Sequence, residues 1–442
     1  MADLFIASQL IRGVGDEPLG GSVGIRVEQG RIAFAGPLTS MRREPRVKVV
    51  EMEGYTLLPG IIDAHLHATW RARDVRRQLQ TTSSYSIIKS LSILKETLFA
   101  GVTSARDMGG ADAGFRLALQ EGIIPGPRLF VSILMISPTG GHGDHFFPSG
   151  VRLAKRPWLP SNIADGVDGV RRLVRETLSL GADFIKLCAS GGITSAGDDF
   201  EDEQFSVEEM AVAVREAAGR KKHVAAHAEN AASVRNALAA GVHSIEHGWF
   251  MDEESVDSMV RRKTWWVPTL ALVDQSLKFR AKNAQWSQAQ LADEAKAEVR
   301  ILARQKESIP LWREAIRRGV RIAFGTDQSH RLLTGRNLVE LEYMVDWLGM
   351  SPLQAVNSAT GEAARCIGVS DIGVLEEGRR ADFIAVQGDP LRDIRILGDP
   401  ENVRLVVKDG VVVKNTLAAA QRQSAGPGFE DESLPGSSIF PS

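Results

Sequence analysis

Short apolar runs recur along the middle of the chain, and longer amphipathic stretches separate them. The stretches between the runs, such as 163–181 and 206–222, space their apolar residues three and four positions apart, as helices do. Several stretches end on a glycine directly before the next run, which is a common helix stop signal. The runs are YTLLPGIIDAHLHA (55–68), TSARDM (103–108), RLFVSILMIS (128–137), DFIKLCAS (183–190), HVAAHA (223–228), SIEHG (244–248), TWWVPTL (264–270) and RIAFGTD (321–327).

Eight strands, each followed by a crossover connection, are the number and order of elements in a (β/α)8 TIM barrel. The alternative is a doubly wound open sheet with helices on both faces. This alternative is less well supported, because no glycine-rich phosphate loop follows the first run. We therefore predict an α/β protein with a TIM barrel over residues 58–370.

The two flanks of the barrel have a different pattern. They hold shorter strand-like pieces with turn signals, at 1–54 and again at 381–415. Each flank is too small to bury a good core alone, so we predict that they form one domain together. The expected limits are 1–57 and 371–420 for a small β-sandwich domain and 421–442 for a flexible C-terminal tail rich in Gly, Ser and Pro.

Composition and charge exclude several classes of function. The 442 residues include 53 basic and 55 acidic side chains, so the net charge of -2 gives no electrostatic reason to expect nucleic acid or an anionic membrane as a partner. No window approaches 18 uninterrupted apolar residues, and the N-terminal segment lacks the features of a signal peptide. The two cysteines, Cys188 and Cys366, cannot make a disulfide framework. We expect a cytoplasmic protein.

A lysine stands in the middle of one apolar run, ADFIKLCASGG (182–192). If Ile185 and Leu187 pack outward against a helix, Lys186 points into the barrel. A lone ammonium group taken out of water is costly unless it is neutralised or paired. Inside the barrel, Lys186 must therefore be either neutralised or paired.

Histidine or aspartate closes four of the runs, and in such barrels catalytic groups lie at the C-terminal ends of strands. His65 and His67 are two positions apart, so both imidazoles face the same side of a strand and suit one divalent metal. His223 and His243 lie roughly 13 Å down their strands from the run ends and are assigned to packing. The run-end residues are His65 with His67, then His227, His247 and Asp327.

These residues resemble, in their order along the chain, the metal-site pattern of the amidohydrolase superfamily. The matching pieces are PGIIDAHLH (59–67), Lys186, His227, His247 and GTD (325–327), and GVLEEGRRADFIAV (373–386) is similar to the return to that family's small β domain. The resemblance implies two divalent ions, most often Zn²⁺. One ion would take His65, His67 and Asp327, the other would take His227 and His247, and an N-carboxylated Lys186 would bridge them. This modification would turn a buried cation into an anion held by two dications.

The resemblance also implies a reaction. A metal-bridging hydroxide would attack an amide or ester carbonyl, and Asp327 would pass the proton to the departing amine. The likeness is greatest to the prolidase-like, imidazolonepropionase-related subgroup, through GVTSARDMGG (101–110) and PTGGHGD (138–144). That subgroup implies dipeptidase or carboxypeptidase activity on small-molecule substrates such as dipeptides and N-acyl amino acids, including ochratoxin. Association into a homo-oligomer is left open.

Four further residues are candidates for substrate contacts. His142, in a glycine loop, would contact the substrate carboxylate or the oxyanion, and Arg106 or His330 would add positive charge. Glu229 stands where relatives often carry an aromatic residue or a histidine. An ionised carboxylate cannot donate a hydrogen bond, so Glu229 would instead bind an amine or a basic side chain. The alternative places Glu229 on the surface at a helix start, stabilised by the helix dipole.

Other functions remain as alternatives. A cyclic amide hydrolase or a deaminase would use the same scaffold, although deaminases typically use one metal and lack the bridging lysine. A phosphotriesterase-like side reaction would need the same centre and a different pocket. A non-catalytic scaffold relative would have lost metal ligands, whereas all six ligand positions are present here.

Overall fold

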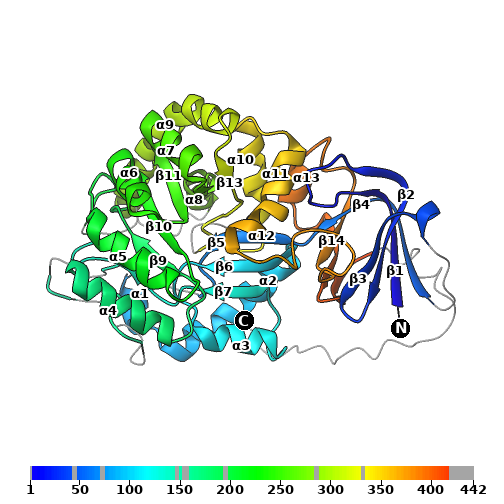
Figure 1. The fold of residues 1–442 in the computed structure, drawn as a ribbon, viewed down its shortest axis with the longest axis horizontal. Coiled ribbons are helices and arrows are strands. Elements are labelled where there is room, and N and C mark those ends of the chain that lie inside the picture. Colours follow the sequence, from blue (N-terminus) through cyan, green and yellow to red (C-terminus); the bar gives the residue numbers. More distant parts are fainter. Residues whose placement is uncertain are drawn as a thin grey trace.

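The computed structural model describes residues 2–41, 47–69, 75–144, 149–151, 159–192, 198–282, 288–329 and 334–417. It shows a barrel beside a smaller β domain (Figure 1). None of the helices among these residues is long and apolar enough to cross a membrane. The predicted tail, 421–442, lies outside the described residues.

The barrel is built from parallel strands that run through the middle of the chain. The strands are β5 (Ile61–Leu66), β6 (Val102–Asp107), β7 (Arg128–Val131), β8 (Met135–Ile136), β9 (Ile185–Cys188), β10 (Val224–Asn230), β11 (Ser244–Phe250), β12 (Trp265–Val267) and β13 (Arg321–Ile322). They pair in chain order as β5–β6–β7 and as β8 through β13. β7 and β8 are two halves of one strand, interrupted near Ile133, whose φ is +65°. This gives the eight strand positions that the sequence predicts.

Backbone hydrogen bonds join the two arcs of strands at both ends. The Ala64 N–H donates to the Phe324 carbonyl at 2.9 Å, and the Asp183 N–H donates to the Val131 carbonyl at 2.8 Å. An isolated parallel bridge between Leu66 and Gln328 continues the first junction. The strands therefore close into a ring, which confirms the predicted fold class.

Helices follow the strands and cover the barrel (Figure 1). Their starts and stops have local causes: Ser206 and Glu209 form a capping box on α5, and Gly241 ends α6 in the left-handed conformation. The helices are α1 (Val75–Gln80), α2 (Ser83–Phe99), α3 (Ala113–Gln120), α4 (Gly166–Ser179), α5 (Val207–Ala218), α6 (Ala231–Ala240), α7 (Glu253–Arg262), α8 (Ala271–Lys282), α9 (Gln288–Arg317), α10 (Glu340–Asp346), α11 (Pro352–Ser358), α12 (Gly361–Ile367) and α13 (Arg395–Gly398), with 3-10 turns η1 (Leu38–Ser40) and η2 (Asn337–Val339).

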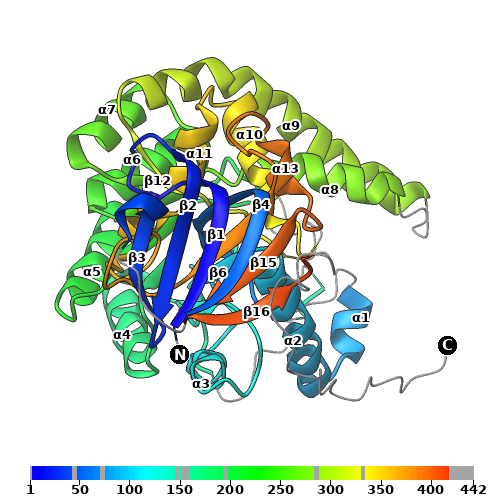
Figure 2. The same ribbon diagram turned by 90° about the vertical axis from the view of Figure 1, so that its right-hand side faces the viewer.

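The two flanks of the chain form one β domain, as the sequence predicts. Its seven strands make a single curved sheet in the order β16-β15-β14-β4-β1-β2-β3 (Figure 2). β4 pairs antiparallel with β14, with Pro59 opposite Phe383, and this pairing joins the flanks. The strands are β1 (Ala2–Leu10), β2 (Leu19–Glu28), β3 (Arg31–Pro37), β4 (Val47–Pro59), β14 (Phe383–Gln387), β15 (Val403–Lys408) and β16 (Val411–Asn415).

The β domain is attached to the barrel by a short link and an ion cluster. β4 passes into β5 through Gly60, where an added Cβ would lie 2.2 Å from Thr103 Oγ1, so only glycine fits. Arg128, on β7, donates to Asp382 at 2.7 Å and to Asp409 at 2.6 Å. These contacts fix the small domain against the side of the barrel at which the strands begin.

A buried carboxyl group, Glu340, holds the start of α8 at the rim of the barrel. It accepts hydrogen bonds from the backbone N–H groups of Leu270 and Ala271, both at 2.7 Å. Burial is the largest influence on Glu340 and raises its pKa to about 8; the two hydrogen bonds lower it, and the charge of Asp63 raises it further. The loop before α8 is thus fixed by a group whose ionisation is unfavourable.

This pKa predicts a pH-dependent contribution to stability. The carboxyl group of Glu340 has an ordinary pKa of 4.5 in the unfolded chain and keeps its proton up to about pH 8 in the folded chain. Between these values the folded state binds more protons, so the free energy of unfolding falls as pH rises, by up to about 1.4 kcal/mol per pH unit. Glu340→Gln cannot ionise and should lack this part of the slope.

Denaturant unfolding of both proteins across this pH range measures the effect. The stability of the native chain relative to Glu340→Gln should decline steadily as pH rises. A difference between the two proteins that stays constant with pH would contradict the raised pKa of Glu340.

Candidate metal centre

The lysine that interrupts the apolar run faces the barrel interior. Ile185 and Leu187 lie in the apolar layer beneath the helices, whereas Phe184, one position before Ile185, belongs to a small inner cluster with Ala225. Lys186 is 1% exposed. The alternation along β9 therefore places its side chain as the sequence phase predicts.

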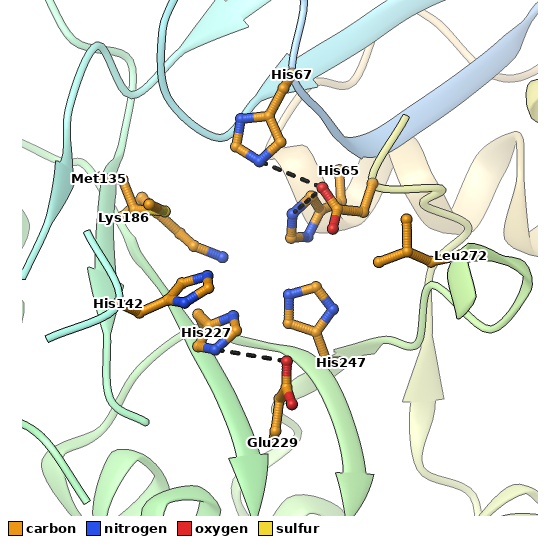
Figure 3. Close-up of a pocket in the computed structure, with 10 residues that line it drawn as sticks. His65, His67, Met135, His142, Lys186, His227, Glu229, His247 and Leu272 are labelled. Carbon is orange, nitrogen blue, oxygen red and sulfur yellow. Dashed lines mark ion pairs between the residues drawn. The ribbon is translucent and has the colours of Figure 1, made fainter. Parts of the chain in front are cut away.

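The ends of several strands bring their polar side chains to one pocket inside the barrel. Figure 3 shows the imidazoles of His65, His67, His227 and His247 and the Lys186 amine around a common space, which Asp327 also lines. The predicted metal ligands all line this pocket, and so do two of the predicted substrate contacts. The lining residues are His65, His67, Met135, His142, Lys186, His227, Glu229, His247, Leu272 and Asp327.

Two of these residues reach the pocket through unusual backbone conformations. His247 has φ +70° and Asp327 has φ +51°, in the left-handed region that residues other than glycine rarely adopt. Along β11, Ile245 packs outward in the apolar layer beneath the helices, and Glu246, the next residue, is bonded to side chains inside the barrel. Strand alternation alone would turn His247 outward, and its left-handed φ turns it in. His247 thus reaches the pocket, as its place at the end of a run predicts, through its backbone conformation and not through strand alternation.

Each candidate histidine ligand has one ring nitrogen bonded away from the centre of the pocket. The other nitrogen is thereby left for the shared space, an arrangement common among metal-binding histidines. The outer bonds are His65 Nδ1 to Glu246 Oε2 at 2.8 Å, His67 Nδ1 to the Gly109 carbonyl at 2.9 Å, His227 Nε2 to the Gly191 carbonyl at 2.9 Å and His247 Nδ1 to Thr269 Oγ1 at 2.7 Å.

Asp327 lies between the two histidines of the HxH pair. Its Oδ1 is 3.3 Å from His67 Nε2 and 3.6 Å from His65 Nε2. Burial raises the pKa of this carboxyl group, but the hydrogen bond from His67 and the charges of His65, His67 and Lys186 outweigh it and lower the pKa to about 2. Asp327 is therefore an ionised acceptor at neutral pH.

Burial sets the charge of most of the other groups. It lowers the pKa of Lys186, and it is the largest cause that holds the pKa values of His65, His227 and His247 well below their usual range. His67 differs: burial lowers its pKa, but the bond to Asp327 and nearby carboxylates raise it overall. Three of the four imidazoles are thus neutral, which is the form that binds metals.

The donor set fits divalent metal ions. One ligand atom each of His65, His247 and Asp327 lies within 4.8 Å of the others, a spacing that suits a shared metal centre. Imidazole nitrogens and carboxylate oxygens are donors that zinc accepts. Lys186 Nζ is buried and has no hydrogen-bond partner within the described part of the chain. A carboxylated amine held by cations would remove this unfavourable state.

His142 lies in the pocket wall, beside one candidate ligand. Its ring stacks on that of His227, with centroids 4.4 Å apart and an angle of 12°. An added Cβ at Gly192 would lie 2.3 Å from the His142 ring, so a side chain there would displace it. The structure therefore brings this loop histidine to the site.

Glu229 also lines the pocket, with 2% of its surface exposed. Its Oε1 is 3.7 Å from His227 Nε2. The alternative of a surface glutamate at a helix start is therefore wrong, because strand β10 continues through this position and buries the side chain.

The structure does not bring Arg106 to the pocket. Its side chain is 0% exposed and bonded inside the barrel to Ala64, Ser244 and Glu246. The predicted substrate contact from Arg106 is therefore wrong. Its guanidinium group already makes hydrogen bonds within the barrel, beneath the pocket. His330 lies outside the described residues.

The sequence did not reveal the groups outside the pocket that position the candidate ligands through hydrogen bonds. Glu246 and Thr269 bond two of the histidines, and Asp107 accepts from three backbone N–H groups around the loop that carries Gly109. The available signal was an acidic residue inside a run that the sequence predicts as a barrel strand, in SIEHG and in TSARDM.

Comparison with known proteins identifies the family of this chain. A model of the amidohydrolase family matches residues 56–413. An ochratoxinase of Aspergillus niger is 35% identical over 374 residues, covering 81% of this chain and 75% of that protein. The A. niger ochratoxinase crystal structure has a TM-score of 0.81 at 31% identity, covering 96% of this chain and 98% of that chain.

Two solved peptidases are similar in structure. A prolidase crystallised with N-methylphosphonate-L-proline has a TM-score of 0.83, and a Xaa-Pro dipeptidase with bound methionine has 0.82; both are 29% identical, and each comparison covers 94% of this chain and 100% of the other. The similarity includes both the barrel and the β domain. The chain therefore belongs to the amidohydrolase family and is a hydrolase that acts on amide bonds.

Proposed function

We propose that this chain is a binuclear-metal amidohydrolase that cleaves the amide bond of dipeptides or N-acyl amino acids. The observation that carries the proposal is the buried Lys186, whose amine has no hydrogen-bond partner within the described residues and lies among the candidate histidine ligands. An N-carboxylated Lys186 would supply the negative charge that two dications need. The deaminase alternative is less well supported, because it gives this lysine no role.

The residues divide into two ligand sets. His65, His67 and Asp327 would hold one ion, since Asp327 Oδ1 lies within 3.6 Å of both imidazoles. His227 and His247, whose ring centroids are 4.7 Å apart, would hold the second. We propose zinc as the metal, because the set combines imidazole and carboxylate donors.

When bound, the two ions would polarise the substrate carbonyl and acidify a water molecule. Asp327 would transfer a proton from the attacking water to the departing amine. Its carboxylate is ionised in the site, so it accepts the proton of the attacking water and delivers it to the departing amine. His142, stacked on His227 at the pocket wall, would contact the substrate carboxylate or the developing oxyanion.

The substrate class rests on the relatives and on the pocket. One relative acts on ochratoxin and two are prolidase or Xaa-Pro dipeptidase structures. The pocket combines two apolar side chains, Met135 and Leu272, with the polar groups of the centre. Such a wall would hold the apolar part of an acyl group or a side chain next to the scissile bond.

A substrate screen tests the proposed function. N-acyl amino acids and dipeptides with varied C-terminal residues are incubated with zinc-loaded enzyme, and release of the free amino acid is followed. Turnover should appear with a subset of C-terminal residues. A fully zinc-loaded enzyme that releases no amino acid from any of them, but opens cyclic amides or deaminates bases, would contradict the proposal.

The first variant tests the lysine bridge. Lys186→Met keeps the aliphatic chain but removes the amine that can be carboxylated, so we expect fewer than one metal ion per chain and loss of turnover together. Metal content by mass spectrometry and amide hydrolysis are the measurements. Lys89→Met, at an exposed position on α2, is the matched control and should keep both metals. Normal turnover with two metals in Lys186→Met would refute the bridge.

The second variant tests proton transfer by Asp327. Asp327→Asn keeps an oxygen ligand but cannot accept the proton, so kcat should fall by about a hundredfold or more while KM changes far less. Metal content is measured in the same samples, so that loss of metal is not mistaken for loss of proton transfer. An unchanged kcat would remove Asp327 from this role.

A further inference from the structure

Directly beneath the candidate metal centre lies a buried carboxylate, Glu246 of β11, with 0% of its surface exposed. Its two oxygens have different partners. Oε1 accepts hydrogen bonds from Arg106 Nη2 at 2.8 Å and from Ser244 Oγ at 2.6 Å. Oε2 lies 2.8 Å from His65 Nδ1. Side chains from β5, β6 and β11 therefore meet at one carboxylate inside the barrel.

Arg106 forms an ion pair with this carboxylate and holds it in position. Its Nε donates to the Ala64 carbonyl at 2.6 Å, and its Nη1 lies 3.3 Å from Ser244 Oγ. The guanidinium group is positively charged and forms an ion pair with Glu246 Oε1 at 2.8 Å. The pair is fully buried, and removing either partner would leave an uncompensated charge in the barrel.

The charge of Glu246 determines which nitrogen of His65 carries the proton. An ionised carboxylate only accepts hydrogen bonds, so Nδ1 must be the donor in the contact between them. A neutral imidazole has one N–H, so Nε2 then keeps its lone pair. That nitrogen is on the opposite side of the ring and lies 3.6 Å from Asp327 Oδ1, in the direction of the shared space.

We propose that Glu246, held by Arg106, is a positioning residue that selects the Nδ1–H tautomer of His65 and thereby presents Nε2 to the first metal ion. The inference rests on the proposed function, because it assigns a purpose to the lone pair on Nε2. It also accounts for an acidic residue and an arginine inside an apolar barrel, where packing alone would favour uncharged side chains.

A single isosteric substitution at Glu246 distinguishes this positioning role from a role in packing alone. In Glu246→Gln, the amide oxygen should stay at the Oε1 position, where two donors, Arg106 and Ser244, point at it. The amide NH2 group then faces His65 Nδ1 and donates to it. The proton of the neutral imidazole moves to Nε2, which can no longer bind a metal without losing that proton.

The tautomer is read directly by nuclear magnetic resonance. The full-length chain is labelled with ¹⁵N-histidine and stripped of metal, and a long-range ¹H–¹⁵N spectrum distinguishes Nδ1–H from Nε2–H. The His65 signals are identified by their absence in His65→Asn. We expect Nδ1–H in the native chain and Nε2–H in Glu246→Gln. An Nε2–H tautomer in the native chain would overturn the proposal even if the variant failed to fold.

Metal retention gives the second readout. Native chain and Glu246→Gln, both purified with zinc, are dialysed against graded concentrations of a chelator, and the ions per chain are counted. The variant should lose one ion at tenfold to roughly a hundredfold less chelator and keep the other, because only the first ion uses His65. Equal loss of both ions, or an unchanged tautomer, would show a general structural role and overturn the proposal.

Ser244→Ala is the matched control. It removes one donor to Oε1 but keeps the carboxylate and Arg106, so His65 should remain Nδ1–H. A switch to Nε2–H in this variant would contradict the role of the Glu246 charge. A native chain that binds no zinc but shows the Nδ1–H tautomer would instead contradict the proposed function, and the two failures are therefore distinguishable.

Discussion

The burial of Lys186 is the constraint to which the rest of the site responds. An amine enclosed by a closed barrel loses its hydration, and burial lowers its pKa, yet Nζ has no hydrogen-bond partner in the described part of the chain. The groups around it are mostly imidazoles that burial keeps neutral, so they do not compensate an ammonium ion. A site of this kind is unfavourable for folding alone. Under the proposed function, metal ions and a carboxylated lysine would balance its charge.

The barrel makes such a site possible because it holds each of the four candidate histidine ligands through the ring nitrogen that faces away from the pocket. The outer nitrogens of the four histidines bond to a carboxylate, two backbone carbonyls and a hydroxyl group. These partners belong to other strands or to the loops after them, so the ring orientations depend on the closed barrel. His247 and Asp327 also hold left-handed backbone conformations, which only a rigid surround maintains.

The β domain contributes to this rigidity from a distance. It carries none of the residues that line the pocket. Its strand β4 continues into β5, the strand that carries the HxH pair, and Gly60 at the junction has no room for a side chain. The cluster of Arg128 with Asp382 and Asp409 fixes the same side of the barrel. The small domain therefore supports the start of the strand whose end carries the candidate metal ligands His65 and His67.

The sequence by itself determined the barrel, the joining of its flanks and the candidate metal ligands that gather in the pocket. Periodicity places Lys186 inside, and parallel strands in chain order bring His65, His227 and Asp327 to one end. Only the tertiary structure decided which polar groups face the pocket and which lie beneath it. Arg106 and Glu246 pair inside the barrel, and Glu229 is buried in the pocket wall. These outcomes depend on partners from other strands and on backbone angles at strand ends, and no local pattern in the chain specifies either of them.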